Sequence, residues 1–251
     1  MLGLGKGMAR MTQSMPDAIV GKRLGFTNTK SLEFGGGEGD YVNTNYTAND
    51  LFRGSFSFSY WINLDSSYAI PIGIEKGTHS QIILQHFNGN VNIIHYSNSD
   101  LAVVTGAGTP VSTNTWHHVV WTFSKNSGSH TTYAMYVDNS AVPQAFLGGH
   151  TVSEANHNAF NSSGEFLAIG ASNDDGTPDT YVDGHMDEVA IFNKALSSGE
   201  VEAIYNSGVP KDESSHDGLF MYYRFEDDVS DTAGTSNGTN NGATFSSTVP
   251  S

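Results

Sequence analysis

Residues 181–193 read Tyr181-Val-Asp-Gly-His-Met-Asp-Glu-Val-Ala-Ile-Phe-Asn193 and decide the fold. Polar and apolar residues alternate along this run, which is the period of a half-buried β-strand. The alternation places Asp187, Val189 and Ile191 on one face, and it places Glu188 on the opposite face. We therefore predict a strand over residues 184–192, with Asp187 opening its core-facing row.

A helix is predicted directly after this strand, in the run Lys194-Ala-Leu-Ser-Ser-Gly-Glu-Val-Glu-Ala-Ile-Tyr205. Ser197 with Glu200 three residues later forms a capping box. Gly208 stands where a left-handed C-cap is expected. The chain thus changes from strand to helix within a few residues.

Working outward from this strand, four motifs in order resemble one family. Gly184-His-Met-Asp-Glu-Val-Ala-Ile-Phe-Asn-Lys-Ala-Leu-Ser is similar to the final-strand signature of laminin-G-like jelly rolls, in the concanavalin A-like lectin/glucanase superfamily. The other matching pieces are Ser31-Leu-Glu-Phe-Gly with Asp40-Tyr-Val, Phe56-Ser-Phe-Ser-Tyr-Trp-Ile, and Trp116-His-His-Val-Val with Met135-Tyr-Val-Asp. The resemblance covers residues 27–208 and implies the fold, but the superfamily is broad in function.

Strand patterns separated by turn signals run through most of the chain. They lie at residues 31–34, 41–44, 55–64, 70–75, 81–87, 91–96, 101–105, 116–125, 132–137, 166–169 and 184–192. Asn88-Gly89 between two apolar runs is a strong hairpin signal. We predict an all-β, antiparallel two-sheet jelly-roll sandwich with one short helix after the signature strand.

The domain organisation follows from the two ends of the chain. Residues 1–25 have weak periodicity and are predicted to be an N-terminal arm, and residues 26–251 form the jelly roll. The apolar run 219–225 is predicted to be a closing strand that covers the edge of strand 31–34, the alternative being the stub of a second repeat. Residues 148–164 and 172–180 are predicted to be long loops.

Composition excludes several classes of partner and site. The net charge is formally −15, with 26 acidic and 11 basic residues, and no basic cluster suits nucleic acid. The absence of cysteine excludes disulfides and thiolate metal sites. No apolar run approaches the roughly 20 residues of a membrane helix, so no membrane partner is expected. The opening ten residues lack the apolar region of a signal peptide.

Glycoside hydrolysis needs two carboxyl groups that act together. Laminarinase-type hydrolases, which share the fold that the resemblance implies, carry Glu-x-Asp-x-Glu or Glu-x-Asp-x-x-Glu on one strand. Here His185 replaces the first Glu, and Val189 and Ala190 occupy the two positions for the last. Alternation also separates Glu188 from Asp187. We therefore predict that the protein is not an enzyme.

Calcium offers another use for the acidic residues, since Ca²⁺ prefers carboxylates and carbonyl oxygens. The family resemblance places Asp40 near Asp187, where the two could share a structural ion, with Glu38 as a further ligand. The alternative is that these carboxylates accept hydrogen bonds from turn amides.

Glycan ligands could be held at two other places. Trp61 could present an aromatic platform to a sugar ring, or it could lie packed under a loop. Asp174, Asp175 and Asp179 form an acidic loop that could hold a ligand or be solvated. None of the ten histidines has the helical spacing of a zinc site.

Residues 204–250 resemble laminin-G-like proteins of marine bacteriophages. This resemblance implies a virion structural protein, a head decoration or fibre-associated module that contacts other virion proteins through the arm, within an oligomeric assembly. Adhesion to host-surface glycans would accompany that role. The alternative is a secreted or cell-surface bacterial carbohydrate-binding module, which the missing signal peptide disfavours.

Overall fold

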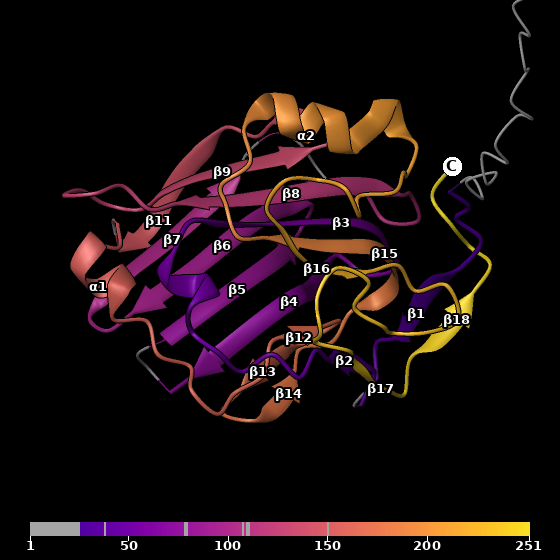
Figure 1. Cartoon of the computed structure of the whole chain (residues 1–251), viewed down its shortest axis with the longest axis horizontal. Helices are drawn as coiled ribbons and strands as arrows, with labels where there is room; N and C mark the ends of the chain where they lie inside the picture. The colour runs from indigo at the N-terminus through magenta and orange to yellow at the C-terminus, as the bar shows by residue number, and fades with distance from the viewer. Residues whose placement is uncertain (1–25, 38, 78–79, 107, 109–110, 150) are drawn as a thin grey trace, which may run out of the picture.

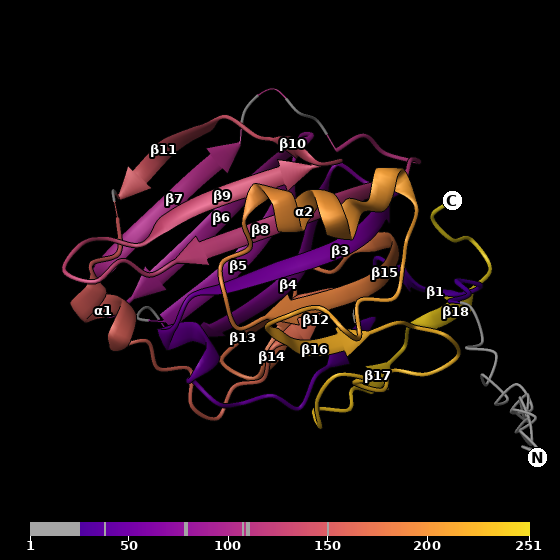
Figure 2. The same cartoon turned by 45° about the horizontal axis from the view of Figure 1, so that its top comes forward.

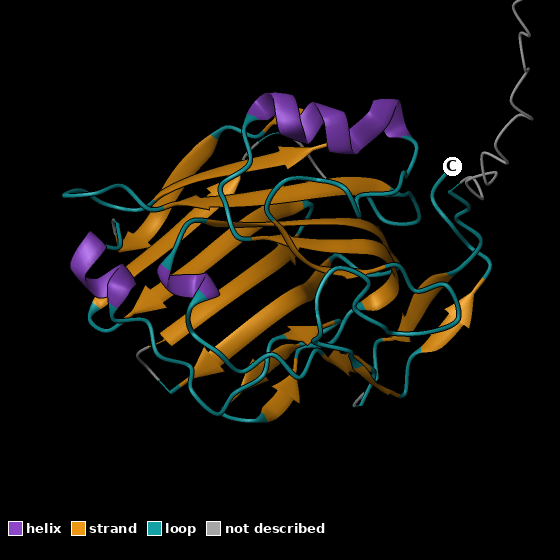
Figure 3. Ribbon diagram, viewed as in Figure 1, coloured by secondary structure: helices purple, strands orange, loops and turns teal. Residues whose placement is uncertain are grey.

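Two β-sheets packed face to face make up the protein in this computed structural model (Figure 1). The structure describes residues 26–251 except 38, 78–79, 107, 109–110 and 150. The predicted N-terminal arm lies outside the described residues. The predicted all-β antiparallel sandwich is confirmed, and helices are confined to short pieces at the periphery (Figure 3).

The first sheet contains the signature strand at its centre. Its order is β10 (Ser140–Ala141), β9 (Thr132–Val137), β8 (His117–Ser124), β3 (Phe56–Leu64), β15 (Asp183–Phe192), β1 (Ser31–Gly35) and β18 (Thr244–Ser246), with β16 (Leu219–Tyr223) paired to β15. The N-terminal half of β15 pairs with β1 and its C-terminal half with β16, so an early and a late segment of the described chain meet along one strand.

The second sheet is built from consecutive hairpins. Its order is β11 (Gln144–Gly149), β7 (Asp100–Gly106), β6 (Asn90–Ser97), β5 (Ser80–Phe87), β4 (Tyr68–Lys76), β12 (Ala168–Ile169), β2 (Tyr41–Asn43) and β17 (Thr239–Asn241). The hairpin of β13 (Ser172–Asp174) and β14 (Thr177–Asp179) lies beside β4. Asn88 and Gly89 both have positive φ, which the predicted two-residue turn requires.

The core lies between the sheets and is rich in aromatic rings. Phe56 stacks on Phe123 with ring centroids 4.3 Å apart, and Phe58 meets Phe123 edge to face. Alternation along β3 sends Phe56, Phe58 and Tyr60 into this core. Tyr60 also accepts a hydrogen bond from the indole of Trp121, so its buried hydroxyl is satisfied.

The predicted alternation of β15 is wrong at one point because the strand carries a β-bulge. The register against β3 shifts between Asp187 and Ala190, and Glu188 has a φ of +47°. Met186 therefore enters the main core together with Val189 and Ile191. Asp187 pairs with Trp61, so both side chains emerge on the outer face of the first sheet.

Helix α2 (Ser198–Tyr205) covers that outer face, as the two views show (Figure 2). The predicted capping box of Ser197 and Glu200 is confirmed. The left-handed C-cap is Asn206 rather than Gly208, because Asn tolerates that conformation and already stops the helix. A second apolar cluster joins the helix to the sheet; it contains Val120, Ala190, Phe192, Leu196, Val201, Ile204 and Tyr222.

Two predictions about connecting segments need correction. Residues 148–164 contain the helix α1 (Glu154–Asn158), which Ser153 caps, and residues 172–180 form the hairpin of β13 and β14. Short 3-10 turns, η1 (Leu51–Arg53) and η2 (Asn206–Gly208), complete the helical pieces. In the described part of the chain, no helix combines the length and apolar character needed to cross a membrane.

The C-terminal run is a strand of the first sheet, as predicted, but it does not cover β1. Strand β18 pairs with β1 instead. Strand β16 pairs with β15 from Val189 to Phe192, beyond the part of β15 that pairs with β1. Met221, Tyr223 and Phe225 enter the main core, and Tyr222 enters the second cluster. The segment therefore contributes to both faces of the first sheet.

Truncation after Gly208 is expected to abolish cooperative folding. Met221, Tyr222, Tyr223 and Phe225 are each at most 1% exposed. Burial of each is worth about 1.5–3 kcal/mol, against a total stability of about 5–15 kcal/mol. Thermal melting followed by near-UV circular dichroism checks this. Deletion of residues 1–21 is the control, because every described contact is retained; a truncated chain that melts like the control contradicts the prediction.

Candidate functional site

Trp61 is not available as an aromatic platform for a sugar, contrary to the first of the two predictions made for it. Its side chain is 5% exposed and stacks on Tyr205 of α2 with ring centroids 6.1 Å apart. His118 packs against the same indole at 5.0 Å. The indole is a packing surface for the helix.

Asp40 and Asp187, the predicted calcium pair, are not brought together. The Oδ2 of Asp40 accepts a hydrogen bond of 2.8 Å from the Gly35 N–H, at one end of β1. Asp187 lies opposite Ser31, four residues further along β1, because Leu32 pairs with Met186. Four residues of strand span about 13 Å, whereas Ca²⁺ binds its ligands at about 2.5 Å. This pair does not fit one shared ion.

Asp187 instead has protein partners on the outer face of the sheet. Its Oδ2 accepts from Asn28 Nδ2 at 2.9 Å, and its Oδ1 accepts from the Glu188 N–H at 2.9 Å. Burial and the neighbouring Glu188 raise the pKa of the Asp187 carboxyl. Among the described residues, no three acidic or histidine side chains converge to hold a metal ion.

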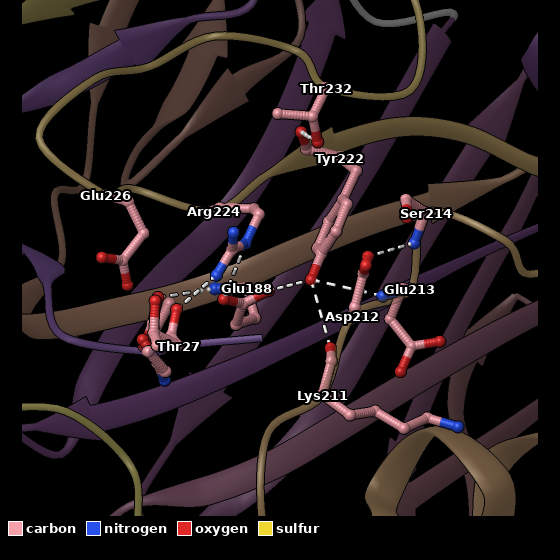
Figure 4. A network of polar contacts seen from close by, with 12 residues as sticks. Thr27, Glu188, Lys211, Asp212, Glu213, Ser214, Tyr222, Arg224, Glu226 and Thr232 are labelled. Atoms are coloured by element: carbon pink, nitrogen blue, oxygen red, sulfur yellow. Dashed lines mark hydrogen bonds and ion pairs between the residues drawn. The ribbon is translucent and has the colours of Figure 1, made fainter. Parts of the chain in front are cut away.

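Glu188 is the centre of a buried polar network (Figure 4). Its Oε2 accepts a hydrogen bond from the Tyr222 hydroxyl, and its Oε1 lies 3.4 Å from Arg224 Nε. Burial raises the pKa of Glu188 to about 8, although Tyr222 and Arg224 act in the opposite direction. At neutral pH the carboxyl therefore keeps its proton, and the contact with Arg224 becomes an ion pair at higher pH.

The same network holds the N-terminal end of the described chain. Arg224 donates to the Thr27 carbonyl at 2.6 Å and lies 4.5 Å from the Phe26 ring centroid. Glu226 accepts hydrogen bonds from the Thr29 backbone and hydroxyl. Asp187 and Glu188 thus join chain segments, and at 0% and 5% exposure they do not face an open cleft of the kind that hydrolysis requires.

The three acidic residues of the predicted loop belong to the hairpin of β13 and β14. Asp175 accepts a hydrogen bond from the Gly77 N–H and lines a hollow of about 520 Å³ with Lys76, Ser80 and Asn161. Burial and the nearby Asp174 raise the pKa of Asp179. Ser80 accepts a hydrogen bond from the Asn161 N–H, and Lys76 donates one to the Ser163 carbonyl.

A row of polar side chains on the outer face of the second sheet was not predicted. Gln85 on β5, Asn92 on β6 and Thr105 on β7 are paired residues of neighbouring strands. Asn92 donates to Gln85 Oε1 at 3.2 Å and accepts from the Thr105 hydroxyl at 2.6 Å. Gln85 Nε2 lies 3.5 Å from the Tyr68 hydroxyl on β4. We call the row of Gln85, Asn92 and Thr105 the ladder; Tyr68 is paired with Phe87, two residues along β5 from Gln85.

Exposed apolar side chains border the ladder. Phe87, two residues along β5 from Gln85, is 48% exposed and packs edge to face against Tyr68, with ring centroids 5.8 Å apart. Leu147 of β11, the strand beyond β7, is 70% exposed. They enclose a hollow of about 410 Å³, which Asn90, Val103 and Gly106 also line. The hollow therefore combines directional polar groups with exposed apolar surface.

The sequence does contain the signal for this row. A two-residue turn at Asn88-Gly89 pairs Phe87 with Asn90 and hence Gln85 with Asn92, as the structure shows. The next turn pairs Asn92 with Thr105 in the same way. Counting outward from both turns would have placed the three polar residues in one row.

Calcium removal is expected to leave the melting temperature unchanged, because the described contacts already satisfy Asp40 and Asp187 with protein donors. Melting curves with and without a chelator check this, with Asp187→Asn as the comparison variant. A ligand that binds only the folded state stabilises it by about 3 kcal/mol at a hundredfold excess over Kd. A chelator-induced fall that Asp187→Asn abolishes would therefore support the calcium prediction instead.

Stability is expected to fall as pH rises from 7 to 9, because Glu188 has a higher pKa in the folded state than in the unfolded state. Its contribution is complete below the unfolded pKa of about 4.5 and is lost as pH rises through 8. This corresponds to a loss of about 1 kcal/mol between pH 7 and pH 9. Urea unfolding across this range checks the slope.

The variant Glu188→Gln is the matched test, since an uncharged amide retains the shape of the protonated acid. We expect its stability to depend less on pH than that of the parent between pH 7 and pH 9. Asp187, whose pKa is raised in the same direction, remains in both proteins. Equal slopes in the two proteins would show that Glu188 does not titrate in this range.

Comparisons with known proteins agree with this architecture. The family model described as the concanavalin A-like lectin/glucanases superfamily, of the laminin G type, matches residues 35–202. None of the functionally curated proteins matches the chain in sequence.

Solved structures are similar in fold at low sequence identity. A candidate carbohydrate-binding protein of Bacteroides ovatus has a TM-score of 0.61 at 18% identity, covering 88% of this chain and 60% of that chain. The CBM40 module of a Ruminococcus gnavus sialidase bound to α2,3-sialyllactose has a TM-score of 0.54 at 12% identity, covering 71% and 99%. A SAP-like pentraxin of Limulus polyphemus has a TM-score of 0.51 at 15% identity, covering 70% and 82%.

This chain spans about 60% of the length of the Bacteroides protein, and these identities establish a shared fold only. The match of the family model extends from the end of β1 into α2, and so includes most of both sheets. The chain belongs to the laminin-G-type family of the concanavalin A-like lectin/glucanase superfamily.

Proposed function

We propose that the protein is a non-catalytic carbohydrate-binding module that holds glycans on the outer face of its second sheet. The observation that carries this proposal is the ladder of Gln85, Asn92 and Thr105 between the exposed side chains of Phe87 and Leu147. This is the alternative predicted from the sequence, a bacterial-type carbohydrate-binding module, rather than the virion role.

A sugar ring presents two kinds of surface to a protein. Its hydroxyl groups need donors and acceptors with fixed directions, and its C–H face packs on apolar or aromatic side chains. The ladder supplies amide and hydroxyl groups, and Phe87 with Leu147 supplies the apolar contact.

The ladder is oriented before any ligand binds. Asn92 is 7% exposed and uses its amide to hold Gln85 on one side and Thr105 on the other. Groups fixed in this way lose little conformational entropy when they bind a ligand, which favours affinity. Gln85 and Thr105 are half-buried, and all three side chains line the hollow, where their amide and hydroxyl groups can meet sugar hydroxyls.

The structural relatives support the proposal in a general way. The Bacteroides protein is described as a candidate carbohydrate-binding protein, and the Ruminococcus module was solved with sialyllactose bound. The absence of catalysis is supported by the closed network around Asp187 and Glu188, in which both carboxyl groups are buried and engaged.

The virion setting remains a prediction from residues 204–250, and a glycan-binding module suits a virion or a cell surface equally well. Attachment to other virion proteins was predicted for the arm at residues 1–25, outside the described residues. Mass spectrometry of purified phage particles from the source would test both the location and the copy number.

Phe87→Ala is expected to weaken glycan binding at least about fivefold, since loss of an aromatic contact costs about 1 kcal/mol. The measurement is a titration of the best ligand from a broad glycan array. Val209→Ala is the matched control, because Val209 is similarly exposed at 51% but follows η2 on the other side of the molecule. Equal affinity of Phe87→Ala and the control would remove this face from the proposal.

A further inference from the structure

The direction of the ladder across the sheet restricts the shape of a ligand. Its members, Gln85, Asn92 and Thr105, are paired residues of three neighbouring strands, β5, β6 and β7, so the row runs perpendicular to the strands. Leu147 on β11 extends the same hollow by one more strand. A ligand that contacts the whole row must therefore be elongated across the strands.

The spacing of the row restricts the ligand further. Neighbouring strands lie about 4.8 Å apart, so Gln85, Asn92 and Thr105 offer polar groups at about this interval. One pyranose ring in an extended oligosaccharide occupies a similar length along the chain. Successive sugar units of an extended chain could then place one set of hydroxyls over each member of the row.

The charge of the side chains that line the hollow restricts the chemical class of the ligand. The described residues that line it, among them Asn90, Val103 and Gly106, are all uncharged. The whole chain carries a formal charge of −15. An anionic sugar would meet a repulsive field and would find no cation among these side chains to offset its desolvation.

We propose that the ligand is a neutral oligosaccharide in an extended conformation, at least three sugar units long, which lies across β5, β6 and β7 along the ladder. This rests on the proposed function and adds the ligand's length, direction and charge. It sets this chain apart from the sialidase module of similar fold, which was solved with an anionic sialyllactose.

The test is a titration series with defined probes, using the full chain. The neutral probes are cello-, manno-, xylo- and chito-oligosaccharides of two to six units, and the anionic probe is α2,3-sialyllactose. We expect at least one neutral series to bind, with affinity rising about tenfold or more from two to four units and then levelling off. Sialyllactose should bind more weakly than the best neutral tetrasaccharide.

The row itself is tested by Thr105→Val, which removes one hydroxyl and keeps the side-chain shape. The variant should reduce the affinity for the best tetrasaccharide while changing the affinity for the disaccharide less. Gln81→Leu is the matched control, because Gln81 lies on β5 four residues from Gln85 and outside the ladder.

The outcomes separate the two proposals. Binding that does not depend on chain length, or preferential binding of sialyllactose, would overturn the ligand class and leave the carbohydrate-binding function in place. Failure to bind any glycan of the array or of the series would overturn both. An unaltered length dependence in Thr105→Val would show that the chain does not follow the ladder.

Discussion

The β-bulge at Glu188 is the constraint on which the first sheet depends. One extra residue with positive φ lets Met186 and Val189 both face the core, and it directs Asp187 and Glu188 to the outer face. A buried carboxyl needs partners, and Tyr222 of β16 and Arg224, which directly follows that strand, provide them. Arg224 then holds Thr27 near the start of the described chain. A local irregularity in one strand thereby joins segments from both ends of the sequence.

The two turns of the second sheet impose a comparable constraint there. Asn88-Gly89 and the turn that contains Asn98, which also has positive φ, each fix a hairpin register without any help from the core. Register decides which residues become neighbours, because a slip of one residue would send Gln85 and Asn92 to opposite faces. The ladder is therefore a consequence of turn chemistry, and the polar row would not exist if either turn changed length.

Most of the fold could be predicted from the sequence, because alternation, turn signals and the capping box are local. The signature strand, the hairpins and α2 follow from residues close together in the chain. The errors have a common physical origin in long-range pairing. The bulge at Glu188 depends on the register of β15 against Trp61 of β3. The edge of β1 is covered by β18, which follows the predicted closing strand in sequence. The hairpin of β13 and β14 forms beside β4, far away in sequence. The ladder could have been predicted by counting residues outward from the two turns. The separation of Asp40 from Asp187 could not, because it follows from the pairing of β1 with β15, which are far apart in sequence.

One outer face of the sandwich is covered by other parts of the chain and the other is exposed. This difference decides where a ligand can bind. Helix α2 and the C-terminal segment cover the first sheet (Figure 2). Trp61 and Tyr222 are therefore used in packing. Over the second sheet, Tyr68, Phe87 and Leu147 remain substantially exposed beside polar groups that are already oriented. Exposed apolar patches on a protein surface commonly mark binding sites. The oriented polar row lies outside the core, so core packing does not account for it. An aromatic residue in the sequence is therefore a weak guide to a sugar site until it is known which sheet face the chain has left open.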